Sequence, residues 1–549
     1  MSTAARVVST ALPPFRNEPL TDFSRREERE AFQRAMADIR ARLPLEAPLL
    51  IGGKRIETEE TIPSVSPSDT SLLCGRSSAA DQAAADKAVA TARRAFEDWS
   101  HTTAEDRAAL LLRTADLMRQ RRHLFSALEV YEAAKPWHEA DADVAEAIDF
   151  LEYYAREAIR LSGRKRLQPY ILGEYNDLSY HPLGVVAVIG PWNFPLAIPV
   201  GMSSAALVTG NTVILKPAEQ TPLVAWLYAR LLEEAGAPPG VFNFLPGRGE
   251  VCGAHLVRHP DVRMIVFTGS RDVGLLIQRE AVAAQQEGLP FVKKIVTEMG
   301  GKNALIVDSS ADLDASVPDA VYSAYGFAGQ KCSALSRLIL LDDVYDVYLR
   351  RFREAVESLK TGPAGDPGTQ VPPVIDAEAA EKVHSYIRMG EESARPVYRA
   401  DVTALAGKGH FVPPAIFEVA SSTHRLAQEE IFGPVVAVLR AGDFDEALRI
   451  ANSTPYALTG GVHSRTVSHL ERARQDFQCG NLYLNRTITG AIVARQPFGG
   501  YRLSGIGAKA GGPDYLKQFM IARAVSENRM RHGSAPLTER GTDDTWEEF

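Results

Sequence analysis

VVAVIG (185–190) is the stretch that decides the fold, because it is a short apolar run that ends in glycine. Three more short, mainly apolar stretches follow it: TVILK (212–216), VFNFL (241–245) and MIVFTG (264–269). Segments with the apolar spacing of helices separate them. Continuous apolar strands that alternate with helices are typical of a parallel sheet with helices on both faces. We therefore predict an α/β fold with a doubly wound sheet.

Polar residues gather where these strands end. WNF (192–194) follows the first strand, Lys216 ends the second, and Gly269 and Ser270 follow the fourth. In doubly wound sheets, ligands bind beyond the carboxyl ends of the strands. The sequence therefore predicts a ligand site along this edge of the sheet.

The region before the sheet is helical, apart from one interruption. A surface helix is expected over 26–43, and apolar residues recur at three- and four-residue steps over 81–161. LQPYILGEYNDLSYHPLG (167–184) instead alternates around Gly173, which predicts a β-hairpin. Two strands alone are marginal in water. We predict that this arm docks on another subunit; packing against its own chain is the alternative.

Composition excludes several classes of protein. The chain has 549 residues, a net charge of −8 and only four cysteines. This charge gives no reason to expect nucleic acid or an anionic membrane as a partner. The cysteine spacing fits neither a metal site nor a disulfide framework, so we expect no metal and a reducing, cytoplasmic setting. No apolar run approaches the length of a membrane helix.

Both ends of the chain differ from the middle. MSTAARVVSTALPPFR (1–16) carries two arginines and no acids, as a weak organelle transit peptide would. We favour a disordered leader, since the stretch is short and contains a proline pair; a mitochondrial matrix location is the alternative for a eukaryotic chain. The acidic tail over 534–549 is expected to be disordered.

Cys332 is the candidate nucleophile. It lies in FAGQKCSALSR (327–337), between Lys331 and Ser333, at the end of an expected helix and after Gly329. The thiolate is the reactive form, so a catalytic cysteine needs a polar, partly electropositive setting. A small core thiol is the alternative, because cysteine is among the most buried residue types. The polar neighbours favour an exposed, reactive thiol.

Other polar residues at strand ends have two interpretations each. Glu298, before two glycines, is either a general base with a raised pKa or a surface carboxylate. Asn193 is either an oxyanion donor or a turn former. Lys216 and Glu219 follow a strand and open an expected helix, and a capped helix start with Pro217 near its first position would also explain them.

Two further motifs are weak on their own. TGSRDVG (268–274) follows a strand and opens a helix, so Gly269 and Gly274 would let the backbone approach a phosphate at the helix N-terminus. EEIFGP (429–434) indicates only a loop.

Six motifs in a fixed order are more specific than any one of them. Together they resemble the aldehyde dehydrogenase superfamily, from about residue 48 to 520. The motifs are PWNFP (191–195), LKPAEQTP (215–222), FTGS (267–270), EMGGKN (298–303), GQKCS (329–333) and EEIFGPV (429–435). NEPLTDF (17–23), DFLEYYARE (149–157) and NRTITGAIVARQPFGG (485–500) are similar to members that oxidise L-glutamate γ-semialdehyde.

The resemblance implies a role for each matching residue. The implied catalytic residues are Cys332 as nucleophile, Glu298 as general base and Asn193 as oxyanion donor. The implied cofactor-binding residues are Trp192, Lys216, Glu219, Gly269, Ser270, Gly274, Glu430 and Phe432. The implied substrate-binding residues are Ser333, Gly490, Ala491, Phe194, Phe498 and Lys331.

The resemblance also implies an organisation. It divides the chain into an N-terminal extension (1–47), a Rossmann-type NAD domain (48–166 and 185–296), a catalytic domain (297–485), an oligomerisation arm (167–184 and 515–533), a substrate loop (486–514) and a tail (534–549). A homo-oligomer, at least a dimer, is expected. EAAKP (132–136), where relatives often have glycine, is a departure that we expect to lie outside the site.

The implied activity is NAD-dependent oxidation of glutamate γ-semialdehyde to glutamate in proline catabolism, through a thiohemiacetal and a thioester on the cysteine. A proline dehydrogenase would supply the substrate. Another semialdehyde or an aromatic aldehyde is the alternative substrate. A silent scaffold and a CoA-acylating transferase are further alternatives; the three catalytic residues argue against the first and Glu298 against the second.

Overall fold

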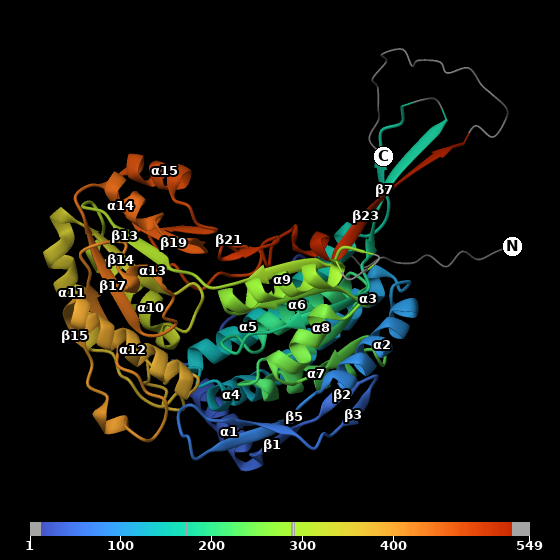
Figure 1. Cartoon of the computed structure of the whole chain (residues 1–549), viewed down its shortest axis with the longest axis horizontal. Coiled ribbons are helices and arrows are strands. Elements are labelled where there is room, and N and C mark those ends of the chain that lie inside the picture. The colour runs from blue at the N-terminus through green and yellow to red at the C-terminus, as the bar shows by residue number, and fades with distance from the viewer. Residues whose placement is uncertain (1–11, 171–172, 287–288, 290, 530–549) are drawn as a thin grey trace.

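The chain folds around two large, mainly parallel sheets (Figure 1). The computed structural model describes residues 12–170, 173–286, 289 and 291–529. We name the eight-stranded sheet, in the order β22-β12-β11-β8-β9-β10-β2-β3, the first sheet. The seven-stranded sheet, in the order β15-β16-β17-β14-β13-β19-β20, is the second sheet. The doubly wound α/β fold expected from the sequence is confirmed.

The first sheet is built from the apolar stretches that the sequence singles out. Its five parallel strands consist mostly of buried residues because helices cover both faces of the sheet, which explains their largely apolar composition. They are β8 (Val185–Ile189), β9 (Thr212–Lys216), β10 (Phe242–Phe244), β11 (Val262–Thr268) and β12 (Lys294–Glu298). Short antiparallel strands extend both edges: β2 (Leu49–Ile51), β3 (Lys54–Ile56) and β22 (Gly505–Ile506). β22 comes from the stretch assigned to the substrate loop.

Helices cover the first sheet, and most were expected. The region 81–161 forms four helices, of which α5 packs on both α3 and α6. The helix expected over 26–43 is α1. These helices are α1 (Arg26–Arg42), α2 (Gln82–Trp99), α3 (Ala104–Gln120), α4 (Arg122–Glu132), α5 (Trp137–Leu161), α6 (Ala197–Val208), α7 (Pro222–Glu234), α8 (Ala254–Arg258) and α9 (Arg271–Gln286). The helix start expected near Pro217 is wrong, because α7 begins at Pro222 and Lys216 still belongs to β9.

The second sheet repeats the plan with its own core and helices. Its strands are β13 (Asn303–Val307), β14 (Leu335–Leu341), β15 (Arg395–Arg399), β16 (Ala415–Glu418), β17 (Val435–Ala441), β19 (Thr459–His463) and β20 (Asn481–Leu484), all parallel except β15. Its helices are α10 (Leu313–Tyr325), α11 (Tyr345–Glu357), α12 (Ala377–Ser393), α13 (Arg425–Gln428), α14 (Phe444–Ala451) and α15 (Val467–Asp476).

One short link fixes how the two sheets face each other. The chain leaves the first sheet at Glu298 and enters the second at Asn303, after a Gly-Gly pair at 300–301. On either side of the link, Asn193, after β8, contacts Gln330, before β14, and Gly301 contacts Glu430, before β17. The carboxyl ends of the first sheet therefore face the amino ends of the second.

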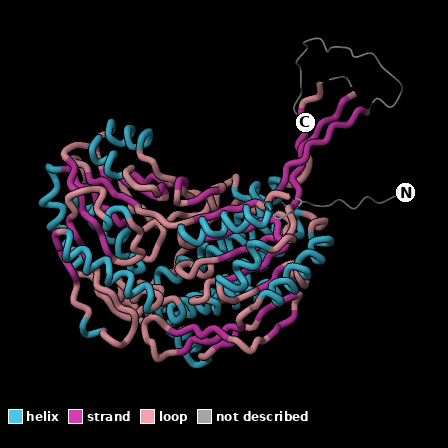
Figure 2. The backbone as a smooth tube through the Cα atoms, viewed as in Figure 1, coloured by secondary structure: helices cyan, strands magenta, loops and turns pink. Residues whose placement is uncertain are grey.

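A three-stranded arm projects from the body (Figures 1 and 2). β7 (Glu174–Pro182) pairs with β6 (Lys165–Leu167) on one side and with β23 (Met520–Asn528) on the other. The predicted hairpin is confirmed, although its first strand begins earlier than residue 167 and residues 171–172 lie outside the described part. β23 lies beside it because it pairs over nine residues.

Small elements complete the fold. A three-stranded sheet holds β1 (Leu45–Ala47), β4 (Thr61–Val65) and β5 (Leu73–Ser78), and β18 (Tyr456–Ala457) pairs with β21 (Tyr501–Arg502). No described helix combines the length and apolarity needed to cross a bilayer. Residues 1–11 of the expected leader and the tail over 534–549 lie outside the described residues.

Candidate active site

Cys332 lies in the tight loop that precedes β14. Gly329 has a φ of +69°, and a Cβ there would be 2.6 Å from the carbonyl oxygen of Gly433. Phe327 and Ala328 also have positive φ values, 53° and 56°. Such backbone strain persists only where the surroundings impose it, and it is common at active sites. The loop is therefore held in one shape by its packing.

The charges around Cys332 differ from the expected electropositive setting. The side chain is half-buried. Burial raises the pKa of the Cys332 thiol well above its ordinary value, and the carboxylates of Glu298 and Glu430 raise it further. Lys331 points its charge elsewhere, since its Nζ donates to Glu139 Oε1 at 2.6 Å. The expectation of an electropositive setting is wrong, and the thiol needs a nearby base to ionise.

Glu298 is the candidate for that base. It is the last residue of β12 and is half-buried. Burial raises the pKa of its carboxyl from 4.5 to about 7, while the Lys509 ammonium acts in the opposite direction. A pKa near neutrality is what a general base needs, because the group can both take and release a proton.

Asn193 contacts the cysteine loop directly. It is buried, and its Nδ2 donates to the carbonyl oxygen of Gln330 at 3.0 Å, two residues before Cys332. The backbone carbonyl oxygen of Asn193 accepts a hydrogen bond from Lys135 Nζ at 3.0 Å. The side chain of Asn193 thus contacts the loop that carries Cys332, and its role as an oxyanion donor remains a prediction.

Asn303 is a residue of the site that sequence reasoning missed. Its Nδ2 donates to the carbonyl oxygens of Cys332 at 2.7 Å and Ala334 at 2.9 Å, and its Oδ1 accepts from the backbone N–H of Thr459 at 3.0 Å. The first residue of β13 therefore holds the backbone on both sides of Ser333. Its place at the end of the EMGGKN motif was the available signal.

Two predicted cofactor residues lie at the carboxyl end of β9. Lys216 is buried, which lowers the pKa of its ammonium, and its Nζ donates to the carbonyl oxygen of Pro217 at 3.0 Å. Glu219 accepts the backbone N–H of Gly249 at 2.8 Å. An ammonium and a carboxylate three residues apart suit ribose hydroxyls, which both donate and accept.

The glycines of TGSRDVG have a packing reason of their own. A Cβ on Gly269 would be 2.5 Å from the Phe267 ring, and one on Gly274 would be 2.5 Å from Met299 Sδ. Ser270 is exposed, and its Oγ accepts the backbone N–H of Val273 at 3.3 Å at the start of α9. The side chains beneath these glycines require them whether or not a phosphate binds.

Glu430 and Phe432 lie before β17 and contact the other predicted residues. Glu430 Oε1 accepts the backbone N–H of Gly301 at 2.9 Å, in the link between the sheets. The Phe432 ring meets the Trp192 ring edge to face, with centroids 5.4 Å apart. These contacts bring residues of both sheets together.

The predicted substrate residues are less closely connected. Ser333 is buried, and its carbonyl oxygen accepts from Thr459 Oγ1 at 3.2 Å. Gly490, with a φ of +71°, and Ala491 belong to the loop after β20. Phe498, in the same loop, pairs with the backbone of Ala510. Their role as a substrate anchor remains a prediction. The Phe194 ring lies beneath Lys135 Nζ, 4.0 Å from it.

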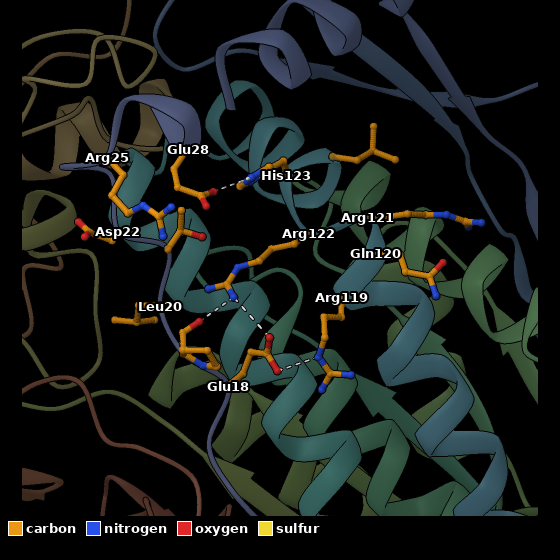
Figure 3. A pocket seen from close by; sticks show the side chains of 13 residues that line it. Glu18, Leu20, Asp22, Arg25, Glu28, Arg119, Gln120, Arg121, Arg122 and His123 are labelled. Atoms are coloured by element: carbon orange, nitrogen blue, oxygen red, sulfur yellow. Dashed lines mark hydrogen bonds and ion pairs between the residues drawn. The ribbon is translucent and has the colours of Figure 1, made fainter. Parts of the chain in front are cut away.

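A separate pocket of 540 Å³ lies between the N-terminal segment and α3–α4 (Figure 3). Its charged side chains are largely paired: Arg119 contacts Glu18 at 2.9 Å and Arg122 contacts Glu18 at 3.6 Å. His123 faces Glu28 at 3.6 Å. The pocket contains none of the predicted site residues, and these ion pairs tie the N-terminal segment to the helical layer.

Asp86, His255 and His259 form a cluster that resembles a metal site. His255 Nε2 lies 2.6 Å and His259 Nε2 3.4 Å from Asp86 Oδ1. However, His259 Nδ1 accepts the backbone N–H of Asp261 at 3.1 Å, which leaves the ring proton on Nε2. The geometry fits hydrogen bonds to Asp86 better than a ligand set.

Comparison with known proteins places this geometry in a family. Residues 55–525 match the model of the aldehyde dehydrogenase family. A protein of Geobacillus sp. (strain WCH70) named 1-pyrroline-5-carboxylate dehydrogenase is 50% identical over 514 residues, which cover 94% of this chain and 99% of that protein. A Bacillus subtilis protein named 1-pyrroline-5-carboxylate dehydrogenase 2 is 48% identical over the same shares.

Solved structures agree. The 1-pyrroline-5-carboxylate dehydrogenase from Thermus with bound NAD has a TM-score of 0.92 and 47% identity, covering 94% of this chain and 99% of that one. Proline utilization A from Bdellovibrio bacteriovorus has a TM-score of 0.93 and 46% identity, covering 96% of this chain and 54% of that one. With the family match and these relatives, the chain belongs to the aldehyde dehydrogenase family.

Proposed function

We propose that the protein oxidises L-glutamate γ-semialdehyde, the open form of 1-pyrroline-5-carboxylate, to L-glutamate with NAD. The observation that carries this proposal is the 50% identity to a protein named 1-pyrroline-5-carboxylate dehydrogenase, 99% of whose length this chain covers. Another semialdehyde or an aromatic aldehyde is the alternative substrate.

Cys332 and Glu298 carry out the covalent chemistry. The Cys332 thiol passes its proton to the Glu298 carboxylate, whose pKa of about 7 suits it to receive one. The thiolate then attacks the aldehyde carbon. Asn193 Nδ2 and the backbone N–H of Cys332 hold the oxyanion, and one such donor contributes about 3 kcal/mol. Covalent catalysis divides one hard step into two easier ones.

The residues present fit a nicotinamide dinucleotide. Lys216 and Glu219 would hold the adenosine ribose, Ser270 would serve the pyrophosphate, and Glu430 and Phe432 would hold the nicotinamide ribose and ring. NAD, when bound, supplies the hydride acceptor, so that the carbon on Cys332 becomes a thioester. Once Glu298 has released the thiol proton to solvent, it can take a proton from water, which attacks the thioester; the acid leaves and the Cys332 thiolate is restored. The charge of Glu219 would repel a 2′-phosphate, so NAD is preferred over NADP.

Specificity comes from the carboxylate of the substrate. Ser333 and the backbone N–H groups of Gly490 and Ala491 grip it, because backbone nests bind anions. Phe194 and Phe498 lie along its aliphatic stem, with Lys331 nearby. The positive φ of Gly490 supports this proposal, since it lets successive N–H groups converge.

The arm joins two copies of the chain. It exposes apolar side chains that nothing in its own chain covers fully: Leu167 is 37%, Ile521 55% and Val525 37% exposed. A second copy would bury them, which makes the enzyme at least a dimer. A proline-oxidising enzyme supplies the substrate, as the likeness to part of proline utilization A suggests. The four cysteines are unpaired, which suits the cytoplasm.

The test is NADH formation from pyrroline-5-carboxylate by the native chain and by Cys332→Ala. The variant should lose at least about 10⁴-fold in kcat, as removal of a nucleophile does in other enzymes. Cys479→Ala, at another half-buried cysteine, is the matched control and should keep its activity. Propanal and benzaldehyde complete the substrate panel. Higher kcat/KM for benzaldehyde than for the semialdehyde would favour the alternative substrate.

A further inference from the structure

Lys135 is a fully buried lysine whose charge is directed at the catalytic turn. It belongs to EAAKP (132–136), between α4 and α5, and its side chain is 0% exposed. Its Nζ donates to Asp143 Oδ2 at 2.9 Å and to the carbonyl oxygen of Asn193 at 3.0 Å. The expectation that this stretch lies outside the site is therefore wrong.

Aromatic rings enclose the same ammonium. Nζ lies 4.0 Å from the centroid of the Phe194 ring and 5.2 Å from that of Phe327. Phe194 follows Asn193 in sequence, and Phe327 lies at the start of the cysteine loop. Lys135 thus contacts both segments that meet at the nucleophile.

The hydrogen bonds around Lys135 form one continuous chain. Asp143 Oδ1 accepts the backbone N–H of Ala197, at the first residue of α6, at 2.8 Å. Asp143 Oδ2 holds Lys135, Lys135 holds the carbonyl of Asn193, and the Asn193 amide donates to Gln330. This chain links two long helices to the backbone two residues before Cys332. The bond from Lys135 holds the backbone carbonyl of Asn193, so the peptide group between Asn193 and Phe194 cannot rotate freely. This restricts the backbone from which the Asn193 side chain projects.

Lys135 has its counter-charge in Asp143, so its bond to Asn193 has no part in neutralising it. Asp143 pairs with it at 2.9 Å, and Glu129 lies on a further side at 3.9 Å. Burial first, and then the charge of Asp143, raise the pKa of Glu129 well above its ordinary value, which keeps it neutral. One buried cation therefore matches one buried anion. An apolar side chain of similar volume would fill this space without the cost of burying two charges.

We propose that Lys135 is a positioning residue for the oxyanion donor. It fixes the peptide between Asn193 and Phe194, so that the Asn193 amide already points at the developing oxyanion before the aldehyde arrives. Preorganised donors are effective because they need no reorientation during the reaction. The inference rests on the proposed role of Asn193 and extends it to a residue that touches neither substrate nor cofactor.

The test is a double-mutant cycle of Lys135→Met with Asn193→Ala, read as kcat for NADH formation. We expect Asn193→Ala alone to lose about 10²- to 10³-fold. Lys135→Met alone should lose about 10- to 100-fold, as misplacement of a catalytic group by a fraction of an ångström to one ångström does. In the Asn193→Ala background, Lys135→Met should cost less than about twofold more, because the group it positions is already gone.

Lys302→Met is the matched control. Lys302 is a second fully buried lysine, its Nζ has no hydrogen-bond partner among the described residues, and it does not contact Asn193. Its effect should be the same in both backgrounds. A structural role for Lys135 would give that same additive pattern, so equal losses from Lys135→Met in both backgrounds would overturn the proposal.

A second variant separates a folding defect from a loss of positioning. Lys135→Met leaves the Asp143 carboxylate buried without its partner, which could prevent folding. If Lys135→Met is insoluble, the double variant Lys135→Met/Asp143→Asn, which removes both charges, takes its place. If neither variant folds, Lys135 is structural and the proposal fails. The cycle is run with propanal as well as glutamate semialdehyde, so that a wrong substrate assignment leaves the coupling measurable. An Asn193→Ala variant with native kcat would remove the proposed donor, and the role of Lys135 with it.

Discussion

The two large sheets contribute to the site from opposite ends. In the first sheet, Asn193 follows β8, Lys216 ends β9 and Glu298 ends β12, all at carboxyl ends. In the second sheet, Cys332 precedes β14 and Glu430 precedes β17, both at amino ends. The rule that ligands bind beyond the carboxyl ends of parallel strands thus describes the first sheet and fails for the second.

The reason lies in the link between the sheets. Residues 299–302 carry the chain directly from β12 to β13, so the amino edge of the second sheet has to face the carboxyl edge of the first. The first sheet then offers strand ends and helix starts, as a nucleotide needs. The second offers loops held by their own packing, which suit a nucleophile. We therefore expect changes on the first side to act on the cofactor and base, and changes on the second to act on the aldehyde.

The largest expected effect in this comparison is at Glu298, where the two sides meet. Glu298→Gln should lower kcat by about 10²- to 10⁴-fold, the usual contribution of a general base. Rapid mixing should show which of its two proton transfers then limits the rate, because a burst of about one NADH per subunit appears only if thioester hydrolysis is slower than attack by Cys332. Linear NADH formation without a burst would place the limiting step before hydride transfer, at proton removal from Cys332.

The pH dependence of the same variant should separate activity from stability. Native kcat should rise through pH 7 as Glu298 loses its proton, since its pKa is about 7. The folded protein binds this proton more tightly than the unfolded chain, so its free energy of unfolding falls as pH rises from 4.5 to about 7, by about 3 kcal/mol. Glu298→Gln should remove that loss.

Urea denaturation at pH 8 should therefore find Glu298→Gln more stable than the native chain, whereas at pH 4.5 the two should be alike. Equal stability at both values would show that Glu298 is solvated and has an ordinary pKa.

The sequence predicts the first sheet better than the second side of the site. Its strands are largely apolar because both faces are covered, and this pattern is local. No local pattern shows that Lys331 turns to Glu139, or that Asn303 holds the backbone of Cys332. Those contacts join residues far apart in the chain. Motif order identified the family where periodicity could not.

Lys135 illustrates the same limit. A lysine between two helices has no local feature that distinguishes it from a solvated one, and its burial depends on α5, the Asn193 turn and Phe327 together. In the arm, by contrast, a local pattern found part of the structure.

Alternation around Gly173 indicated the hairpin of the arm, but the third strand of the arm comes from residues 520–528, more than 300 positions away, and no local pattern shows that pairing.

Ser333→Ala tests the second side. The change removes a hydroxyl that is proposed to bind the substrate carboxylate, and a hydrogen bond to a charged group contributes about 1.5–3 kcal/mol. KM for glutamate semialdehyde should rise about 10- to 100-fold, while KM for propanal, which has no carboxylate, and KM for NAD should change little. An equal rise for both aldehydes would argue against the anchor.

Glu219→Gln, on the first side, should have the smallest effect and the opposite selectivity. Gln keeps an oxygen that can accept the Gly249 N–H, now bonded at 2.8 Å, but removes the charge that would repel a 2′-phosphate. Glu219 is half-buried, and in water one such repulsion amounts to about 1 kcal/mol, so the preference for NAD over NADP in kcat/KM should fall at least about fivefold. Glu219 follows β9 in the chain and contacts Gly249 rather than the cysteine loop. KM for the aldehyde should therefore stay unchanged. If Glu219→Gln altered aldehyde KM while Ser333→Ala altered NADP use, the division of labour between the two sheets would be wrong, since each change would then act across the link at 299–302.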